Sequence, residues 1–249
     1  MSQKAIDAAI LAHLCDPDTR NGFELEGHSL RNVVSGRIYP IRDGIPLFIS
    51  TVSGANLKQM NFYDRVAPMY DLFTRGAREK LYPAAIAELE LEPGMRLLEV
   101  AIGTGATLPY LPQNVELFGL DISLHMLRKC RKNLEHHHRA AHLFHAEACR
   151  LPFREEVFDR VLHIGGIGKF TEPARALKEM VWVSKPGSKI VVVDRIEAQP
   201  AEEGAAAHAE APVEHLLKHL PADVIDVRTS VIGDGQWFCV SFWKPEAAA

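Results

Sequence analysis

Cysteine is scarce in this 249-residue chain, and its four copies, Cys15, Cys130, Cys149 and Cys239, lie far apart. None of them forms the C-x-x-C pairs of zinc sites and redox motifs, and the wide scatter argues against a disulfide framework. Long apolar runs are also missing, since none approaches the roughly 18 residues that a membrane span needs. The first residues lack the apolar core of a secretory signal. These absences predict a cytoplasmic protein with no membrane span.

Positive charge is not in excess either. The formal net charge is −4, which leaves no electrostatic footprint for nucleic acid, so a nucleic-acid partner is not expected. A basic run at 128–132 has helical spacing and is expected on a solvated helix face. The histidines at 136–138, with His142 and His145, are expected to be incidental, and no metal site is predicted. The chain is 47% hydrophobic and 24% charged, as ordinary globular proteins are.

Helices and apolar strands alternate along most of the chain, as a parallel sheet requires. Strands are predicted at 96–101, 115–120, 141–146, 158–163 and 189–194. Helices are predicted near 77–90, after Ser123 as N-cap, and near 173–184, the last ended by the Lys-Pro-Gly run at 185–187. The segments 223–231 and 236–243 predict a hairpin, and the Ala/Glu-rich stretch 197–212 is expected to be mobile or only partly helical. This predicts a small β-rich module over 1–55 and an α/β domain over 56–249.

A glycine-rich run follows the first apolar strand. Residues 98–105 read LEVAIGTG, which is expected to lie between a strand and a helix, and Asp121 ends the next strand. Glycine is needed where the backbone turns sharply and a ligand approaches it closely. A carboxylate about 20 residues further on can accept both hydroxyls of a ribose. The run offers no third glycine at a helix start, so the expected ligand has a ribose and a positive charge rather than a diphosphate.

Five blocks in a fixed order resemble those of class I S-adenosylmethionine-dependent methyltransferases, with the ubiquinone/menaquinone C-methyltransferase-like branch most similar. The resemblance runs from about residue 62 to the C-terminus. It implies a Rossmann-like, doubly wound seven-stranded sheet with an antiparallel C-terminal hairpin, and S-adenosyl-L-methionine as cofactor. The blocks are FYD at 62–64 with YD at 70–71; the glycine run; GLDIS at 119–123 with ML at 126–127; LPF at 151–153 with FD at 158–159; and ALKEM at 176–180 with KPG at 185–187.

The resemblance also implies which residues bind the cofactor. The acid that heads the glycine run fixes this loop and lies near the ammonium of the methionine moiety, which the small residues of the run line. Asp121 binds the ribose hydroxyls, and two apolar side chains after it pack on the adenine. The family's Gly-Asp-Ala is Ala-Glu-Ala at 146–148 here, so its glutamate is the candidate for the adenine amino group. The implied set is Glu99, Ala101, Gly103, Gly105, Asp121, Ile122, Met126, Glu147 and Ala148.

The acceptor is expected over the carboxyl end of the strand at 158–163, because ligands of doubly wound sheets collect there. His163 ends that strand and is a candidate base for a substrate hydroxyl or acidic carbon, or else a hydrogen-bonded structural histidine. Gly165, Gly166 and Phe170 are expected to face the substrate, with a tight turn as the alternative. Tyr63 and Tyr70 precede the core, and either cover the cofactor and substrate or serve packing alone.

The first module resembles a zinc-ribbon-like domain that is fused to, or partners, some methyltransferases. The usual form has two C-x-x-C pairs, but here the four positions hold Cys15, Asp18, Asn32 and Ser35. One thiolate, one carboxylate and two neutral oxygens suit structural zinc poorly, and His28 does not restore the set. A metal-free remnant is expected, held by Phe23, Leu25, Leu30, Ile38, Tyr39 and Ile41.

Three functions stay open at this point. The first is methyl transfer to an oxygen, carbon or nitrogen of a small-molecule acceptor by in-line displacement, which needs positioning and exclusion of water rather than a Ser/His/Asp constellation. The second is RNA methylation, which would show as a salt-dependent shift of RNA. The third is a non-catalytic cofactor-binding partner protein, which a measurable methylated product would eliminate.

Overall fold

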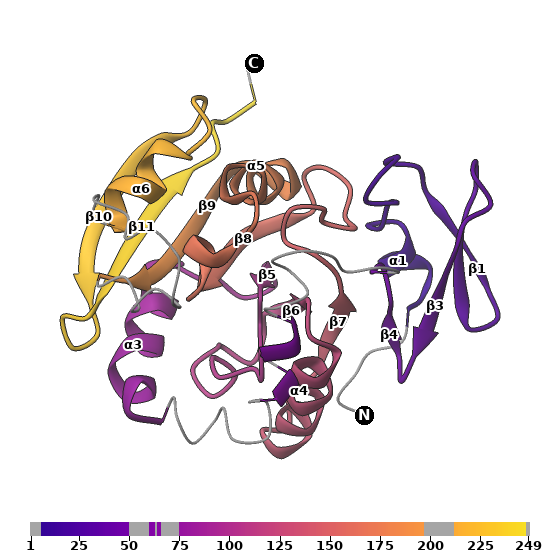
Figure 1. Cartoon of the computed structure of the whole chain (residues 1–249), viewed down its shortest axis with the longest axis horizontal. Coiled ribbons are helices and arrows are strands. Elements are labelled where there is room, and N and C mark those ends of the chain that lie inside the picture. Colours follow the sequence, from indigo (N-terminus) through magenta and orange to yellow (C-terminus); the bar gives the residue numbers. More distant parts are fainter. Residues whose placement is uncertain (1–5, 50–59, 63, 66–74, 197–211, 248–249) are drawn as a thin grey trace.

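The computed structural model describes residues 6–49, 60–62, 64–65, 75–196 and 212–247. Figure 1 shows these residues arranged around a central sheet, with the N-terminal unit at one end of it and the C-terminal hairpin at the other. The helices on both faces of the sheet give the layered α/β architecture that the sequence predicts. None of the described helices is long and apolar enough to cross a membrane.

The central sheet has seven strands in the order β10-β11-β9-β8-β5-β6-β7. The strands β5 to β9 are parallel, whereas β11 is antiparallel to both β9 and β10. The predicted doubly wound sheet with an antiparallel hairpin is therefore confirmed. The bounds are β5 (Arg96–Val100), β6 (Glu116–Asp121), β7 (Ala141–His145), β8 (Phe158–Ile164), β9 (Ser184–Arg195), β10 (Ile225–Ile232) and β11 (Trp237–Trp243).

In the described part of the chain, four helices cover the two faces of this sheet: α3 (Arg75–Glu88), α4 (Leu124–His136), α5 (Pro173–Val183) and α6 (Pro212–Lys218). Residues of α3 and α4 belong to one buried apolar cluster, and residues of α5 and α6 belong to another on the opposite face. The predicted N-cap of α4 is confirmed, because the Ser123 hydroxyl accepts a hydrogen bond from the Met126 amide (3.1 Å). The residues between β9 and α6, at 197–211, lie outside the described part of the chain.

The strand β9 begins earlier than predicted. The predicted helix near 173–184 ends at Val183, one residue early, and the chain enters β9 at Ser184 rather than at the predicted residue 189. Pairing with β8 is interrupted between Phe158 and Arg160, whose partners are Ser184 and Lys189. The Lys-Pro-Gly run therefore forms a bulge at the start of a strand. Proline cannot donate to the ladder, and glycine tolerates the left-handed backbone of such a bulge.

The expected helix directly after the glycine run is also absent from the described residues between β5 and β6. The chain instead makes successive tight turns, in which Gly105, Leu108 and Tyr110 each donate to the carbonyl three residues earlier. Pro109 and Pro112 lack an amide hydrogen and interrupt any longer helical ladder. The loop therefore stays short and close to the carboxyl ends of the strands.

The N-terminal unit contains a small, separate antiparallel sheet. It contains α1 (Ala8–Leu11), β1 (Phe23–Glu26), β2 (Ser29–Asn32), β3 (Ile38–Arg42) and β4 (Ile45–Pro46), with the strands paired in chain order. Leu47, directly after β4, forms a parallel bridge with His145 of β7, and Leu14 bridges Phe153. The core of this unit is continuous with the α5-side cluster. Figure 1 shows the unit beside β7, at the edge of the large sheet.

Two of the six side chains expected to hold this unit together are misassigned. Leu25 is 46% exposed and Ile38 is 57% exposed. Neighbouring residues of a strand point to opposite faces, and Tyr39, which follows Ile38, takes the buried face instead. Tyr39 packs edge-on against Phe23, with ring centroids 5.5 Å apart. The core of the unit is therefore narrower than its apolar sequence indicates.

Candidate functional site

The glycine run forms the floor of a site at the carboxyl ends of β5 and β6. Ala101, Gly103 and Gly105 have φ angles of +59°, +57° and +76°, in the left-handed region that favours glycine. A side chain at Gly105 would collide with Leu108 and Cys130, since its Cβ would lie 2.7 and 2.9 Å from them. Ala101 stands where the resembled family often has glycine. Its methyl group makes it the strained member of the run.

Asp121 links this loop to the end of β6. One carboxylate oxygen accepts the Gly103 amide (2.9 Å) and the other accepts the Ser123 amide (2.8 Å). Burial raises the pKa of Asp121 to about 6, and the two amide donors oppose that rise. An ionised carboxylate has about four lone-pair sites, so two remain for hydroxyls of a ligand. Asp121 is the last residue of β6 and lies beside the loop, as predicted.

Glu99 lies beneath the loop rather than in it. Its carboxylate accepts a hydrogen bond from the Thr107 hydroxyl (2.6 Å), which ties β5 to the turns after the glycine run. Burial raises the pKa of Glu99 to about 8, and the nearby charge of Asp121 adds to the rise. The site therefore contains two buried carboxyl groups and no neighbouring cation in the described residues that lowers either pKa. Such a pair favours a positively charged ligand.

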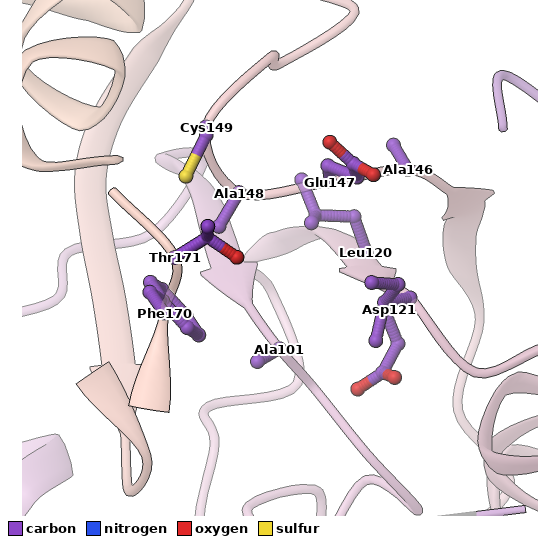
Figure 2. Close-up of a pocket in the computed structure, with 10 residues that line it drawn as sticks. Ala101, Leu120, Asp121, Ala146, Glu147, Ala148, Cys149, Phe170 and Thr171 are labelled. Carbon is purple, nitrogen blue, oxygen red and sulfur yellow. The ribbon is translucent and has the colours of Figure 1, made fainter. Parts of the chain in front are cut away.

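A small pocket, partly open to solvent, lies between these carboxyl ends and the segment after β8. Figure 2 shows Asp121 and Glu147 at one side of it and Phe170 with Thr171 at the other. Six residues of the predicted site line it: Ala101, Asp121, Ile122, Glu147, Ala148 and Phe170. Four more were not predicted, namely Leu120, Ala146, Cys149 and Thr171, and each adjoins a predicted residue in the sequence.

Other predicted residues surround the pocket without lining it. Glu99, Gly103 and Gly105 support the loop, and Met126 is buried in the first turn of α4. Gly165 and Gly166 have φ angles of +78° and +98° and turn the chain from β8 into the short 3₁₀ helix η1 (Ile167–Lys169). Tyr63 and Tyr70 lie outside the described residues.

His163 is fully buried at the end of β8. Its Nδ1 lies 2.9 Å from the Val100 carbonyl oxygen, and because a carbonyl only accepts, Nδ1 carries the proton. Its Nε2 has no hydrogen-bond partner among the described residues. Burial lowers the pKa of His163, so the ring is neutral with a bare lone pair on Nε2. The Phe170 ring lies against it, with centroids 5.0 Å apart.

Three of the four positions that the sequence compares with zinc ligands, Asp18, Asn32 and Ser35, belong to a hydrogen-bonded cluster. Its centre is the buried Asp16, which was not predicted, and whose carboxylate accepts from the Asn32 amide nitrogen (2.7 Å) and the Tyr39 hydroxyl (2.8 Å). The same carboxylate accepts the Asp18 amide, while the Asn32 side-chain oxygen accepts the Ser35 amide. No group of three metal-binding side chains occurs among the residues that the structure describes.

Part of the chain is similar to known proteins. Residues 98–192, which span the glycine run, Asp121 and His163, match the family model of a methyltransferase domain. A demethylmenaquinone methyltransferase of Renibacterium salmoninarum is 34% identical over 137 residues, which are 53% of this chain and 56% of that protein. A phosphatidylethanolamine N-methyltransferase of Cereibacter sphaeroides is 32% identical over 126 residues, 50% of this chain and 62% of that protein. The chain thus spans just over half the length of these curated relatives.

Solved structures agree on the fold. The [4+2]-cyclase SpnF superposes with a TM-score of 0.63 at 18% identity, covering 83% of this chain and 100% of that one. A SAM-dependent methyltransferase from Aquifex aeolicus has a TM-score of 0.57 at 18% identity, covering 74% of this chain and 98% of that one. At such identities the likeness concerns the fold alone. It confirms the predicted Rossmann-like, doubly wound fold.

Proposed function

We propose that this chain is an S-adenosyl-L-methionine-dependent methyltransferase that acts on a small-molecule acceptor. The observation that carries the proposal is the pair of buried carboxyl groups, Glu99 and Asp121, beneath and beside a left-handed glycine loop that opens into the pocket. A ligand with a cationic amino acid part and a ribose fits this donor set, whereas a diphosphate would meet negative charge.

The chain's own residues would hold the cofactor as follows. Asp121 accepts the ribose hydroxyls with the lone pairs that its two amide donors leave. Glu99 balances the ammonium of the methionine moiety, which passes over Ala101, Gly103 and Gly105. Ile122 and Met126 pack beside the adenine, Ala148 lines its pocket, and the Glu147 carboxylate accepts from the exocyclic amino group. When bound, the cofactor supplies a methyl group that is electrophilic because a sulfonium carries it.

The acceptor is proposed to lie over the carboxyl end of β8, bounded by Gly165, Gly166 and Phe170, with Tyr63 and Tyr70 covering it. In-line transfer needs the nucleophile on the far side of the methyl group and water excluded, and such orientation alone supplies several kcal/mol. His163 is the proposed base. Its neutral Nε2 can take a proton from a hydroxyl or an acidic carbon of the acceptor once Phe170 gives way.

The proposal is tested by incubating the protein with cofactor labelled in the methyl group and small-molecule extract, then identifying labelled products by mass spectrometry. We expect a labelled small molecule and S-adenosylhomocysteine in equal amounts. Cofactor binding without a methylated product would favour a non-catalytic partner protein. Label in RNA, together with a salt-dependent RNA shift, would favour the nucleic-acid alternative.

Replacing Gly166 with leucine should lower turnover by about a hundredfold or more, since bulk at this wall displaces the acceptor from the line of transfer. Cofactor affinity, measured by calorimetry, should stay within about threefold of wild type, because Gly166 does not line the pocket. Gly168→Leu is the matched control, since an added Cβ there meets nothing within 4 Å.

The backbone conformation of Gly166 restricts which residues can replace it. Its φ of +98° strains any leucine, so Gly166→Asn, which tolerates the left-handed region better, is measured alongside. Turnover that survives in both variants, or cofactor binding that is lost with turnover, would show that the acceptor lies elsewhere.

We further propose that residues 1–55 are a degenerate zinc-ribbon-like module, fused to a methyltransferase domain over 56–249, and that the protein works in the cytoplasm. Elemental analysis of the purified protein should find well below one zinc per chain, because the cluster around Asp16 is satisfied by amide and hydroxyl donors. A stoichiometric zinc that disappears in Cys15→Ser would contradict the degenerate assignment.

A further inference from the structure

The loop at residues 146–150 forms the adenine side of the proposed cofactor pocket. Ala146, Glu147, Ala148 and Cys149 all line the pocket, and Figure 2 shows them in sequence along one of its walls. The loop contains no helix or strand, so its own secondary structure does not fix the Glu147 carboxylate. What holds its two ends therefore decides where that carboxylate lies.

The first end of the loop is held by the segment after β4. The Phe48 amide donates to the carbonyl of His145 (2.9 Å), the last residue of β7. Leu47 bridges the same residue in parallel register. His145 in turn donates from Nε2 to the Ile122 carbonyl (2.8 Å), which connects this contact to the wall of the pocket that follows Asp121.

The second end of the loop is held by the segment around α1. The Cys15 amide donates to the Pro152 carbonyl (3.1 Å), and the Arg154 amide donates to the His13 carbonyl (2.9 Å). Leu14 and Phe153, which these bonds flank, are both fully buried. The N-terminal unit therefore contacts the loop on both sides through two segments that are 30 or more residues apart in the chain.

Arg20 makes the most specific of these contacts. Its guanidinium donates to the Leu151 carbonyl (2.9 Å) and forms an ion pair with Glu179 of α5. The other carboxylate oxygen of Glu179 accepts the Leu151 amide (2.8 Å). Both backbone polar groups of Leu151 are thus satisfied by this pair. Arg20 itself has a left-handed φ of +61°, and its amide donates to the Asp16 carbonyl (2.8 Å).

We propose that the N-terminal unit holds the adenine-side loop in place by its two ends. In this proposal Arg20 is a positioning residue, which sets the preference of the pocket for adenine. The inference rests on the proposed function, in which Glu147 accepts the adenine amino group. Removing the guanidinium leaves the Leu151 carbonyl and the buried Glu179 carboxylate without their cationic donor. The loop end then relaxes, and Glu147 loses its fixed distance from the base.

The test compares two ligands that differ only at the base. S-adenosylhomocysteine carries an amino group that donates to a carboxylate, whereas S-inosylhomocysteine carries a carbonyl there. Calorimetry should show that Arg20→Gln weakens S-adenosylhomocysteine by roughly tenfold and S-inosylhomocysteine by less than about threefold, so the preference between them shrinks. A general loss of stability would weaken both ligands equally, which would overturn the proposal.

Arg31→Gln is the matched control. Arg31 lies in the same unit and pairs with Glu24 and Glu26, so its loss should leave both affinities unchanged. If Arg20→Gln fails to fold, Glu179→Gln tests the same contact, since it keeps an oxygen for the Leu151 amide but loses the charge and the oxygen that accepts from Arg20. An unchanged preference in a folded variant overturns the role of Arg20. A wild-type protein without any preference would instead contradict the role of Glu147, and with it that part of the proposed function.

Discussion

Replacing Asp121 with alanine should weaken S-adenosylhomocysteine binding by about a hundredfold or more. Each ribose hydroxyl that donates to a carboxylate contributes about 1.5–3 kcal/mol, and the variant loses two such bonds. It also loses the link between the Gly103 and Ser123 amides, so the loop loosens as well. Isothermal titration calorimetry on the folded variant, checked by circular dichroism, measures the effect.

A ligand that lacks one ribose hydroxyl distinguishes two causes of weaker binding: the loss of hydrogen bonds to the ribose, and the loosening of the loop. The wild-type protein should bind the 2′-deoxy analogue of S-adenosylhomocysteine more weakly than the parent ligand, whereas Asp121→Ala should bind the two almost equally. Asp223→Ala, on the exposed turn before β10, serves as the control for a lost surface carboxylate. If the variant still distinguishes the two ligands as well as wild type does, the ribose assignment is wrong.

Replacing Glu99 with glutamine should change cofactor binding and stability in opposite directions. The amide keeps an oxygen for the Thr107 hydroxyl but cannot balance an ammonium, so affinity should fall by roughly ten- to a hundredfold. The same change removes a buried carboxyl that must otherwise ionise above pH 8. Thermal unfolding at pH 8.5 should therefore show the ligand-free variant to be more stable than wild type.

The direction of the pH effect follows from the raised pKa of Glu99, about 8 in the folded chain against an ordinary 4.5. Between these values the folded state binds a proton that the unfolded state releases. The stabilising contribution is therefore fully present below about pH 4.5 and is lost as the pH rises through 8. Glutamine removes this slope. A variant that keeps the wild-type slope between pH 5 and 8 would show that Glu99 is not the group responsible.

Cofactor affinity should show the opposite dependence on pH in the wild-type protein. Both Glu99 and Asp121, whose pKa is raised to about 6, accept from the ligand as carboxylates, so protons must leave before it binds. Affinity should rise from pH 6 to pH 8.

The central sheet and the loop on it could be predicted from the sequence because their signals are local. The apolar strands alternate with amphipathic helices, and the glycines sit where the backbone has φ above zero. Asp121 was predictable for the same reason, since it ends a strand at a fixed interval from the run. Glu147 and Ala148 were placed by the resemblance alone, and both line the pocket.

Other features depend on contacts that no local pattern encodes. Asp16 reads as one of several acids in a turn, but it is the buried acceptor for Asn32 and Tyr39, which follow it by 16 and 23 residues. Arg20 contacts Leu151, 131 residues away. The side chains of Leu25 and Ile38 face solvent because the sheet has only one covered face. His163 was predicted at the end of its strand, but its complete burial behind Phe170 was not.

The pairing of Phe48 with His145 has a consequence for the order of events on the ribosome. The N-terminal unit is synthesised before its partners, since His145 of β7 and Phe153 follow about a hundred residues or more later. At about 5–20 residues per second, this leaves the unit incomplete for roughly 5–20 seconds. Leu14 lacks its partner Phe153 during that time, which leaves apolar surface of the nascent chain exposed. Synonymous codons that slow translation between β4 and β7 would prolong this exposure and increase aggregation without changing a single residue.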